Sequence, residues 1–340
     1  MTGKFENIQI CGISAAVPSK IEENAKAAEI LGERRCRKQI KLTGVKSRHV
    51  SAEEQVLSDL CYPAAKKLME HLKWQPDEIK VLVLLTQCEN YRTPSTAFLI
   101  QKLLGIPQDC IVFDMNLGCS AFNAGIQVVA SLLQQFPGNI KALCFQGDLA
   151  YESIHHDMSA DAVASNMLFG SAASVVAIEK MEQRCGFAIP IDTLSDGKRY
   201  RAILRHYNDS LNMDGEAVFA FSIGDVADSI IDFRKKNRIF EPDIDFYVFH
   251  QAQKLILDNI AEICEIPEGK ELRSLEEYGN TSGASIPLSL CVNGSRYADK
   301  DKIRILSCGF GVGLTWSTSY IEIETKNILP VLVSDVLYEK

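Results

Sequence analysis

The chain has 340 residues, which corresponds to about two domains at the usual ~150 residues each. Hydrophobic residues make up 46% and charged residues 24%, a composition that excludes a disordered chain, a collagen-like fibre and a small disulfide scaffold. The net charge of -8 argues against nucleic acid as a partner.

Short β-rich runs alternate with helical patterns along the chain. Strands are expected at residues 81–85, 111–113, 142–145, 174–178, 246–249, 303–306 and 320–323. Helices are expected over 53–72 and 252–264, where apolar residues share one face. This alternation predicts layered α/β architecture, and the region 180–215 is the most irregular and polar part.

The 11 cysteines are the unusual feature of the composition. The N-terminus has no long apolar run after its charged residues, and no stretch approaches ~18 apolar residues, so we expect a cytoplasmic protein without membrane insertion. Thiols are reduced in that compartment. No two cysteines are three positions apart, so no zinc site or other metal is predicted. Most cysteines, such as Cys11 and Cys144, lie in apolar runs and are expected to be packed side chains.

The sequence distances between Thr86 and Cys119 and between His250 and Asn280 are similar, which indicates an internal duplication. One strand ends at Thr86, 33 residues before Cys119, and another ends at His250, 30 residues before Asn280. A further strand follows 26 residues after both Cys119 and Asn280. Two halves of similar architecture would produce these intervals, although so few anchors can also agree by chance.

Cys119 lies where a strand and a sharp turn lead into a helix that begins at Ser120. A thiol at a helix N-terminus is close to the positive end of the macrodipole, which favours the thiolate. Its backbone N–H can also bind an oxyanion. The alternative for Cys119 alone is a packed helix start.

His250 and Asn280 each have an ordinary explanation, as a histidine at a strand end and as a turn residue that caps a helix. Taken with a cysteine nucleophile, they form a pair that can donate hydrogen bonds to a carbonyl oxygen as it becomes negative. An Asp or Glu in their place would repel the developing charge. The combination therefore points to chemistry through an enolate.

Three segments that carry these residues resemble the active-site motifs of β-ketoacyl-acyl-carrier-protein synthase III. They are Gly118-Cys119-Ser120-Ala121, His250-Gln251-Ala252-Gln253 and Gly279-Asn280-Thr281-Ser282-Gly283-Ala284-Ser285-Ile286-Pro287. One position departs from the family pattern, with Gln253 in place of Asn. The resemblance covers nearly the whole chain, from about residue 8 to 323.

The resemblance implies a thiolase-like five-layered αβαβα fold with two pseudo-duplicated halves, 1–180 and 181–340, usually in a homodimer. It implies that Cys119 takes an acyl group from a thioester and that His250 and Asn280 bind a malonyl-carrier extender. Loss of CO₂ then gives a carbanion that attacks the acyl group. The backbone N–H groups of Cys119 and Val312 would form the oxyanion hole. Acyl-CoA or acyl carrier protein would supply substrates, with no bound cofactor.

Several substrate-contacting positions differ from the family pattern. The positions of the coenzyme A-contacting Trp and Arg residues hold Lys38, Leu42 and Val163, which removes phosphate-pairing groups. Lys254 stands beside a leucine that replaces the Arg associated with carrier docking. Thr93 matches a pocket-floor Phe from the partner subunit, so we expect an acyl chain longer than acetyl. Phe169, in the family's Phe-Gly motif, is a further candidate substrate contact.

Two other functions remain open from the sequence. A related acyltransferase would pass the acyl group from Cys119 to an alcohol or amine, with His250 as a general base. A non-catalytic partner subunit is the other alternative, although such proteins usually lose the nucleophile. Glu89 lies near the place where thiolase-fold relatives have a general base, but a solvated loop glutamate is the simpler explanation. His155 and His156 are interpreted as surface histidines.

Overall fold

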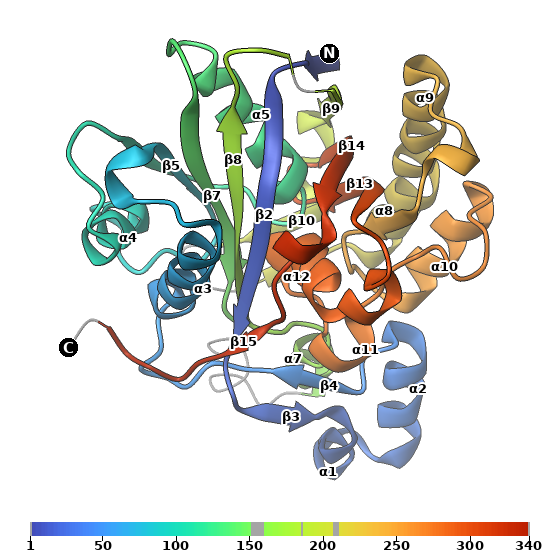
Figure 1. The fold of residues 1–340 in the computed structure, drawn as a ribbon. Coiled ribbons are helices and arrows are strands. Elements are labelled where there is room, and N and C mark those ends of the chain that lie inside the picture. Colours follow the sequence, from blue (N-terminus) through green and yellow to red (C-terminus); the bar gives the residue numbers. More distant parts are fainter. Residues whose placement is uncertain (1, 151–159, 185, 207–210, 339–340) are drawn as a thin grey trace.

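Two large β-sheets dominate the structure, a computed structural model that describes residues 2–150, 160–184, 186–206 and 211–338 (Figure 1). The first sheet has six strands in the order β15-β2-β8-β7-β5-β6. Its strands are β2 (Ile8–Val17), β5 (Ile79–Leu85), β6 (Ile111–Met115), β7 (Ile140–Asp148), β8 (Ala172–Lys180) and β15 (Leu332–Val333). The central strands are buried on both faces and correspondingly apolar.

The second sheet has five strands in the order β1-β9-β14-β13-β12. They are β1 (Thr2–Phe5), β9 (Ile189–Ser195), β12 (Phe246–Phe249), β13 (Lys302–Gly311) and β14 (Thr315–Glu324). The two sheets share a pairing pattern, since β12 runs parallel to β13 as β5 does to β7, and β13 pairs antiparallel with β14 as β7 does with β8. β14 and β9 then pair antiparallel, as do β8 and β2.

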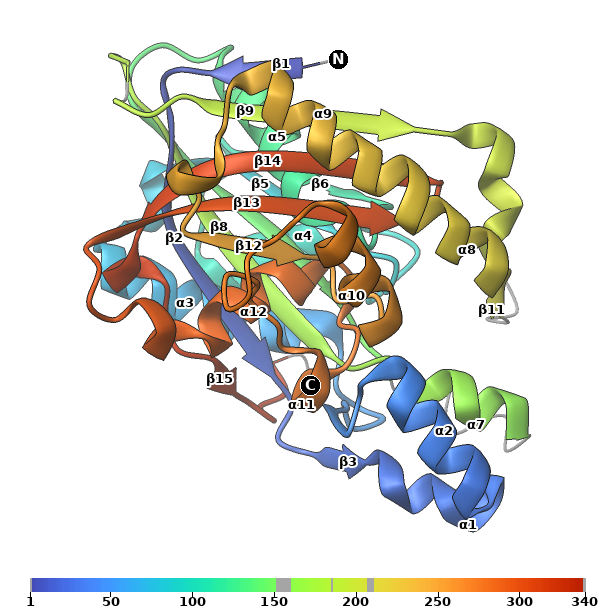
Figure 2. The same cartoon turned by 90° about the vertical axis from the view of Figure 1, so that its right-hand side faces the viewer.

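Helices form three layers around these sheets (Figures 1 and 2). The inner layer is α5 (Ala121–Leu133) and α12 (Ser285–Val292), while α3 (Leu57–Leu72) and α4 (Thr96–Leu104) cover the outer face of the first sheet. The outer face of the second sheet is covered by α8 (Gly215–Phe221), α9 (Ala227–Asn237) and α10 (Lys254–Ile263).

Three apolar clusters match these layers. One lies between the sheets and includes Phe122 of α5 and Ile286 of α12. The second lies under α3 and α4, and the third under α9 and α10. Helix, sheet, helix, sheet and helix layers confirm the predicted thiolase-like architecture.

The matching sheets support a division into two halves, which we propose at residues 1–180 and 181–340. The two ends of the chain cross this division. β1 pairs with β9 in the second sheet, and β15 pairs with β2 in the first. Each sheet therefore takes one edge strand from the other half.

A small lobe projects below the layered body in Figure 2. Its elements are β3 (Ile21–Glu23), α1 (Ala28–Leu31), α2 (Glu33–Thr43), β4 (Ser47–His49) and α7 (Ala160–Asn166). Gly44 caps the C-terminal end of α2. A Cβ on Gly44 would lie 2.6 Å from Cβ of Lys254, so the lobe contacts the start of α10. α11 (Leu275–Tyr278) lies between the lobe and α12 (Figure 1).

All seven predicted strands lie within observed strands, and both predicted helices are present, with α3 beginning at Leu57 rather than residue 53. The region 180–215 is more ordered than expected. It contains β9 and a ribbon of β10 (Ile203–Arg205) and β11 (Leu211–Met213). The sequence of β9 becomes polar after its first three residues because the rest of the strand is half-buried or exposed. A periodic apolar pattern was therefore missing.

Candidate active site

Cys119 lies in the tight connection between β6 and α5. The helix begins at Ala121, and the Ser120 hydroxyl is 2.6 Å from the hydroxyl of Thr315 on β14, which ties the helix start to the second sheet. β13 approaches the cysteine from the other side. A Cβ on Gly311 would lie 2.7 Å from Cys119 Cβ and 2.8 Å from Sγ, so this approach requires glycine.

Three groups near the Cys119 sulfur lower the pKa of its thiol. They are its own backbone N–H, the backbone N–H of Val312 and the hydroxyl of Ser282. Burial and then the charge of Asp148 raise this pKa more, to about 11. Burial therefore outweighs the effect of the helix start on the pKa, and Cys119 is a thiol at neutral pH.

His250 directly follows β12, and its backbone N–H donates to Cys308 O at 2.9 Å. Its Nδ1 is 2.9 Å from the Ser285 hydroxyl, and its ring meets Phe310 edge-on at 5.5 Å. Burial lowers the pKa of His250 to about 4, so the imidazole is neutral at pH 7. If Ser285 donates to Nδ1, the ring proton is left on Nε2.

Asn280 is held by its backbone and its side chain. Its N–H donates to Leu168 O at 2.8 Å, and its carbonyl accepts from Gly170 N–H at 3.0 Å. The side-chain oxygen Oδ1 accepts from Ser282 N–H at 2.9 Å, which fixes the orientation of the amide. Nδ2 is therefore the group that faces His250 Nε2, at 3.5 Å.

The structure thus brings the three predicted residues into one site, in which His250 and Asn280 are buried and Cys119 is half-buried. His250 and Asn280 present two side-chain nitrogen atoms side by side. Ser282, whose N–H donates to Asn280 Oδ1, places its hydroxyl beside the turn that carries Cys119, 3.0 Å from the position of a Cβ on Gly118. Two donors at one point suit a carbonyl oxygen that gains negative charge. The backbone N–H groups of Val312 and Cys119 are close enough to the thiol of Cys119 to lower its pKa.

The candidate substrate contacts are dispersed. Phe169 forms a parallel bridge with Asn280 and so borders the site. Thr93 lies exposed in the loop between β5 and α4, and Val163 is buried on α7. Lys38 and Leu42 are exposed on α2.

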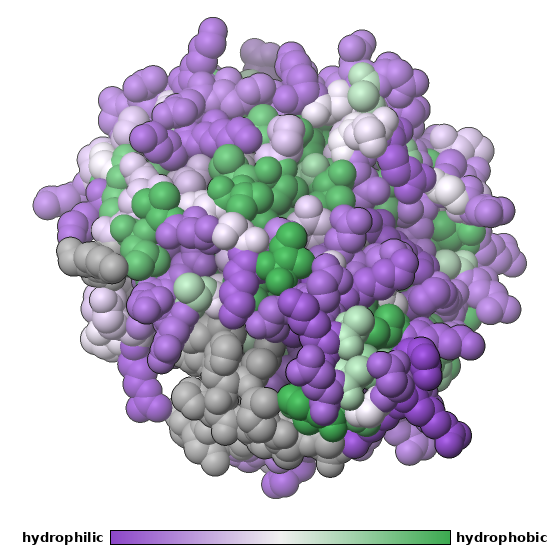
Figure 3. Space-filling view, turned by 90° about the horizontal axis from the view of Figure 1, so that it is seen from below, coloured by the Kyte–Doolittle hydropathy of each residue, from purple (hydrophilic) through white to green (hydrophobic). Residues whose placement is uncertain are grey.

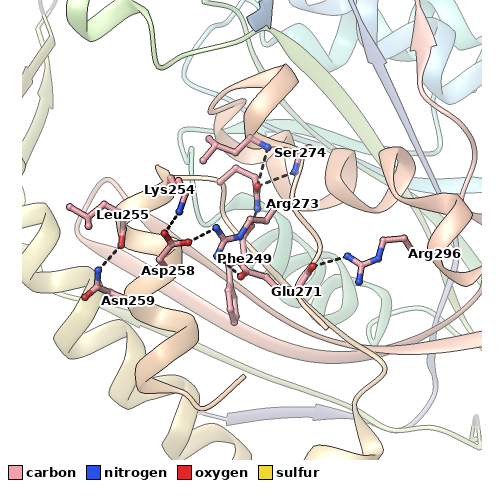
Figure 4. A network of polar contacts seen from close by, with 11 residues as sticks. Phe249, Lys254, Leu255, Asp258, Asn259, Glu271, Arg273, Ser274 and Arg296 are labelled. Carbon is pink, nitrogen blue, oxygen red and sulfur yellow. Dashed lines mark hydrogen bonds and ion pairs between the residues drawn. The ribbon is translucent and has the colours of Figure 1, made fainter. Parts of the chain in front are cut away.

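Lys254, at the start of α10, is neutralised by its neighbours. Its ammonium pairs with Asp258 one turn later, and Asp258 also pairs with Arg273 at 2.6 Å (Figure 4). Arg273 in turn pairs with Glu271 at 2.6 Å. A carrier phosphate would have to compete with Asp258 for Lys254.

Ser282 and Asp148 are functional candidates that sequence reasoning missed. Ser282 belongs to the Gly279–Pro287 motif, but its residue type alone suggested no function. Asp148 is the last residue of β7. A polar residue at the carboxyl end of a buried strand was the available signal for Asp148. Glu89 is exposed in the loop after β5, and His155 and His156 lie outside the described residues.

Neither a membrane span nor a metal cluster occurs in the part of the chain that the structure describes. No described helix is both long and apolar enough to cross a membrane. No three described His, Cys, Asp or Glu residues are grouped as ligands for a metal ion.

Known proteins resemble this chain in fold and in sequence. The family model described as 3-oxoacyl-[acyl-carrier-protein (ACP)] synthase III C terminal matches residues 235–323. A crystal structure of 3-oxoacyl-(acyl-carrier protein) synthase from Burkholderia xenovorans LB400 superimposes with a TM-score of 0.92 at 27% identity, over 98% of this chain and 99% of that one. It defines the class as a thiolase-fold condensing enzyme.

Two relatives narrow the assignment. The β-ketoacyl-[acyl-carrier-protein] synthase III of Clostridium perfringens strain SM101 is 29% identical over 94% of this chain and 100% of its own length. The β-ketoacyl-[acyl-carrier-protein] synthase III of Lactococcus lactis subsp. cremoris strain SK11 is 30% identical over 83% of this chain and 89% of its own length. The chain belongs to the β-ketoacyl-[acyl-carrier-protein] synthase III family. It is therefore a condensing acyltransferase, and transfer to an alcohol or amine is not favoured.

Proposed function

We propose that the protein joins an acyl group to a malonyl thioester by decarboxylative Claisen condensation in fatty-acid or related biosynthesis. Cys119 accepts the acyl group, and the N–H groups of Cys119 and Val312 stabilise the oxyanion of this step. His250 and Asn280 bind the thioester carbonyl of the extender. Loss of CO₂ leaves an enolate whose carbon attacks the acyl group and releases the Cys119 thiol.

The observation that carries this proposal is the neutral donor pair of His250 and Asn280 beside the half-buried thiol of Cys119. The 3.5 Å separation of His250 Nε2 and Asn280 Nδ2 allows one oxygen to accept from both. A neutral imidazole stabilises an enolate by hydrogen bonding without protonating it at once. No step of this chemistry requires a metal or a redox cofactor, because departure of CO₂ provides the carbanion.

The substrates we propose are thioesters of coenzyme A or of an acyl carrier protein. Charge on α2 supports a negatively charged carrier. This helix has five basic side chains against one acid, Glu33, although the whole chain has a net charge of -8. The basic residues of α2 are Arg34, Arg35, Arg37, Lys38 and Lys41.

The α2 surface is accessible and borders the start of α10. Figure 3, seen from below, shows deep purple side chains gathered at the lower right, where α2 lies. Arg34, Lys38 and Lys41 are exposed and form no hydrogen bond or ion pair with other described residues. Lys254, in contrast, is held by Asp258. We therefore propose that α2, rather than α10, attracts the carrier.

We further propose a homodimer in which β6 pairs with β6 of a second copy. β6 is an edge strand whose residues are all exposed or half-buried, which is unusual for a strand in such a sheet. Three large apolar side chains that lie on or near this edge are exposed, namely Tyr91, Phe98 and Ile111. Thr93 lies in the same region, so dimerisation would bring it toward the partner's pocket. The cytoplasmic setting stays a prediction.

The test separates loading from decarboxylation. Intact-protein mass spectrometry should show one acyl adduct on the wild type with acyl thioesters and none on Cys119→Ala. The Cys119→Ala variant should still release CO₂ from malonyl carrier, because His250 and Asn280 remain. Wild-type protein that forms no adduct with a broad panel of acyl-CoA and acyl-carrier donors would contradict the proposal.

A further inference from the structure

Ser285, the first residue of α12, lies against the imidazole ring of His250. Its side chain is buried, and its Oγ is 2.9 Å from Nδ1 of the ring. The backbone N–H of Gln251 donates to the same oxygen at 3.4 Å. Two groups of the turn that follows β12 therefore meet at one hydroxyl on the neighbouring helix.

The surroundings of the Ser285 hydroxyl decide the direction of its hydrogen bond with His250. A serine Oγ has one hydrogen to donate and two lone pairs that accept, and the N–H of Gln251 uses one lone pair. Among the described residues, Nδ1 of His250 is the acceptor hydrogen-bonded to this hydroxyl. If Nδ1 carried the ring proton, Oγ would accept twice and a buried O–H would lack an acceptor, which costs free energy. The contact therefore favours an unprotonated Nδ1.

The single ring proton then belongs on Nε2, beside Asn280. Burial lowers the pKa of His250 to about 4, which outweighs the opposite effect of the Ser282 backbone, so the ring has one proton at pH 7. Asn280 Nδ2 lies 3.5 Å from Nε2 and 3.5 Å from the carbonyl oxygen of Ala252, which can accept one of its two hydrogens. With a proton on Nε2, the two nitrogens cannot satisfy each other, and both can donate to an oxygen placed beside them. With a proton on Nδ1, Nε2 would accept from Asn280, and the donor pair would be lost.

The backbone that presents His250 to Ser285 is fixed by the buried side chain of Gln251. Its Nε2 donates to Phe249 O at 2.7 Å, so it is tied to the end of β12. Its Oε1 accepts from the backbone N–H groups of Ser274 and Leu275 at 3.1 and 3.2 Å, where α11 begins. The turn therefore holds the imidazole and the Gln251 N–H in place against one hydroxyl.

We propose that Ser285 is a positioning residue that fixes the Nε2–H tautomer of His250, an inference that deepens the proposed function and rests on His250 as a donor to the extender carbonyl. The Ser285 hydroxyl donates to Nδ1, and the ring keeps its proton on Nε2. When CO₂ leaves, the electron pair of the breaking C–C bond forms the enolate, whose oxygen accepts from Nε2–H and from Asn280 Nδ2. Ser285 transfers no proton and acts through His250 alone.

The tautomer of His250 can be measured without turnover. Protein labelled with ¹⁵N-histidine is studied by NMR at pH 7, and the His250 signals are those that disappear in His250→Gln. The couplings between ring nitrogens and ring protons should place the wild-type proton on Nε2. In Ser285→Ala, the Asn280 donor favours an unprotonated Nε2, so the signals should shift toward the Nδ1–H form. Ser285→Thr keeps a hydroxyl and should restore the Nε2–H form. A proton on Nδ1 in the wild type, or an unchanged tautomer in Ser285→Ala, overturns the proposal.

Release of CO₂ from malonyl carrier tests the catalytic consequence. Ser285→Ala should lower kcat ~10²-fold, as for the loss of one oxyanion donor, and should change KM by less than about twofold. Ser289→Ala is the matched control, because this buried hydroxyl lies one turn later on α12 and is 2.8 Å from the hydroxyl of Ser274. It should keep the tautomer and the CO₂ release of the wild type. Equal CO₂ release by Ser285→Ala and Ser289→Ala refutes the positioning role. The proposed function fails separately, if wild-type protein is never acylated or releases no CO₂.

Discussion

Replacing Gly311 with alanine tests whether β13 shapes the nucleophile. The new Cβ would lie 2.7 Å from Cys119 Cβ and 2.8 Å from Sγ, both inside normal van der Waals contact. Because the competing atoms belong to the side chain of Cys119, the proposed nucleophile, the sulfur must shift relative to the backbone N–H groups of Cys119 and Val312. Overpacking of this kind costs about 1–3 kcal/mol of stability.

The expected effect on activity is larger than that on stability. Loss of one oxyanion donor costs about 10²–10³-fold in rate, so acylation of Cys119 should slow by that factor in Gly311→Ala. Rates of adduct formation are followed by intact-protein mass spectrometry, and the free energy of unfolding by urea titration. Gly294→Ala is the control, because no atom lies within 4 Å of its new Cβ. Acylation of Gly311→Ala within about twofold of wild type would refute the assigned geometry.

Three further predictions follow from the site and its surroundings. Because the pKa of His250 falls from 6.5 unfolded to about 4 folded, only the unfolded chain binds a proton there between those values, so stability falls as pH falls through that window. Urea titrations from pH 6.5 to 5.0 should show a loss of about 1.5 kcal/mol that is absent in His250→Gln. Asn280→Ala should lower decarboxylation of malonyl carrier about 10²-fold, measured as CO₂ release, with a smaller effect on acyl loading. Lys38→Glu with Lys41→Glu should raise KM for malonyl carrier and weaken its salt dependence, and an unchanged KM would place docking elsewhere.

The acyl pocket can be tested at Thr93. We expect medium-chain thioesters to load Cys119 faster than acetyl-CoA in the wild type. Thr93→Phe should slow the longer donors and leave acetyl loading unchanged, as read from adduct masses in a mixed-donor competition. Faster loading of wild type by acetyl-CoA would contradict the expectation of a deep pocket.

The sequence could identify candidate reacting groups because their chemistry depends on residue type in short local patterns. Cys119, His250 and Asn280 each follow a strand or turn, and buried strands such as β12 are continuous apolar runs. The layered fold followed from their alternation with helices. The terminal strands could not be predicted in the same way, since β1 and β15 pair with partners far along the chain.

The protonation state of the site was beyond sequence reasoning. A helix start suggested a thiolate at Cys119, but desolvation depends on how much of the protein covers the sulfur, and it raises the pKa to about 11. The backbone of Ser282 could not be predicted either, because a serine rarely adopts a φ of +49°.

Decarboxylative condensation of the acyl group on Cys119 is tested most directly with isolated acyl-enzyme. Wild-type protein acylated on Cys119 is freed of donor and mixed with malonyl carrier, and adduct mass, CO₂ and product are followed together. If the acyl-enzyme condenses with the extender, the adduct disappears at the rate at which CO₂ and β-ketoacyl thioester appear. Loss of the acyl group as a free acid, an ester or an amide, without CO₂ release, would contradict it.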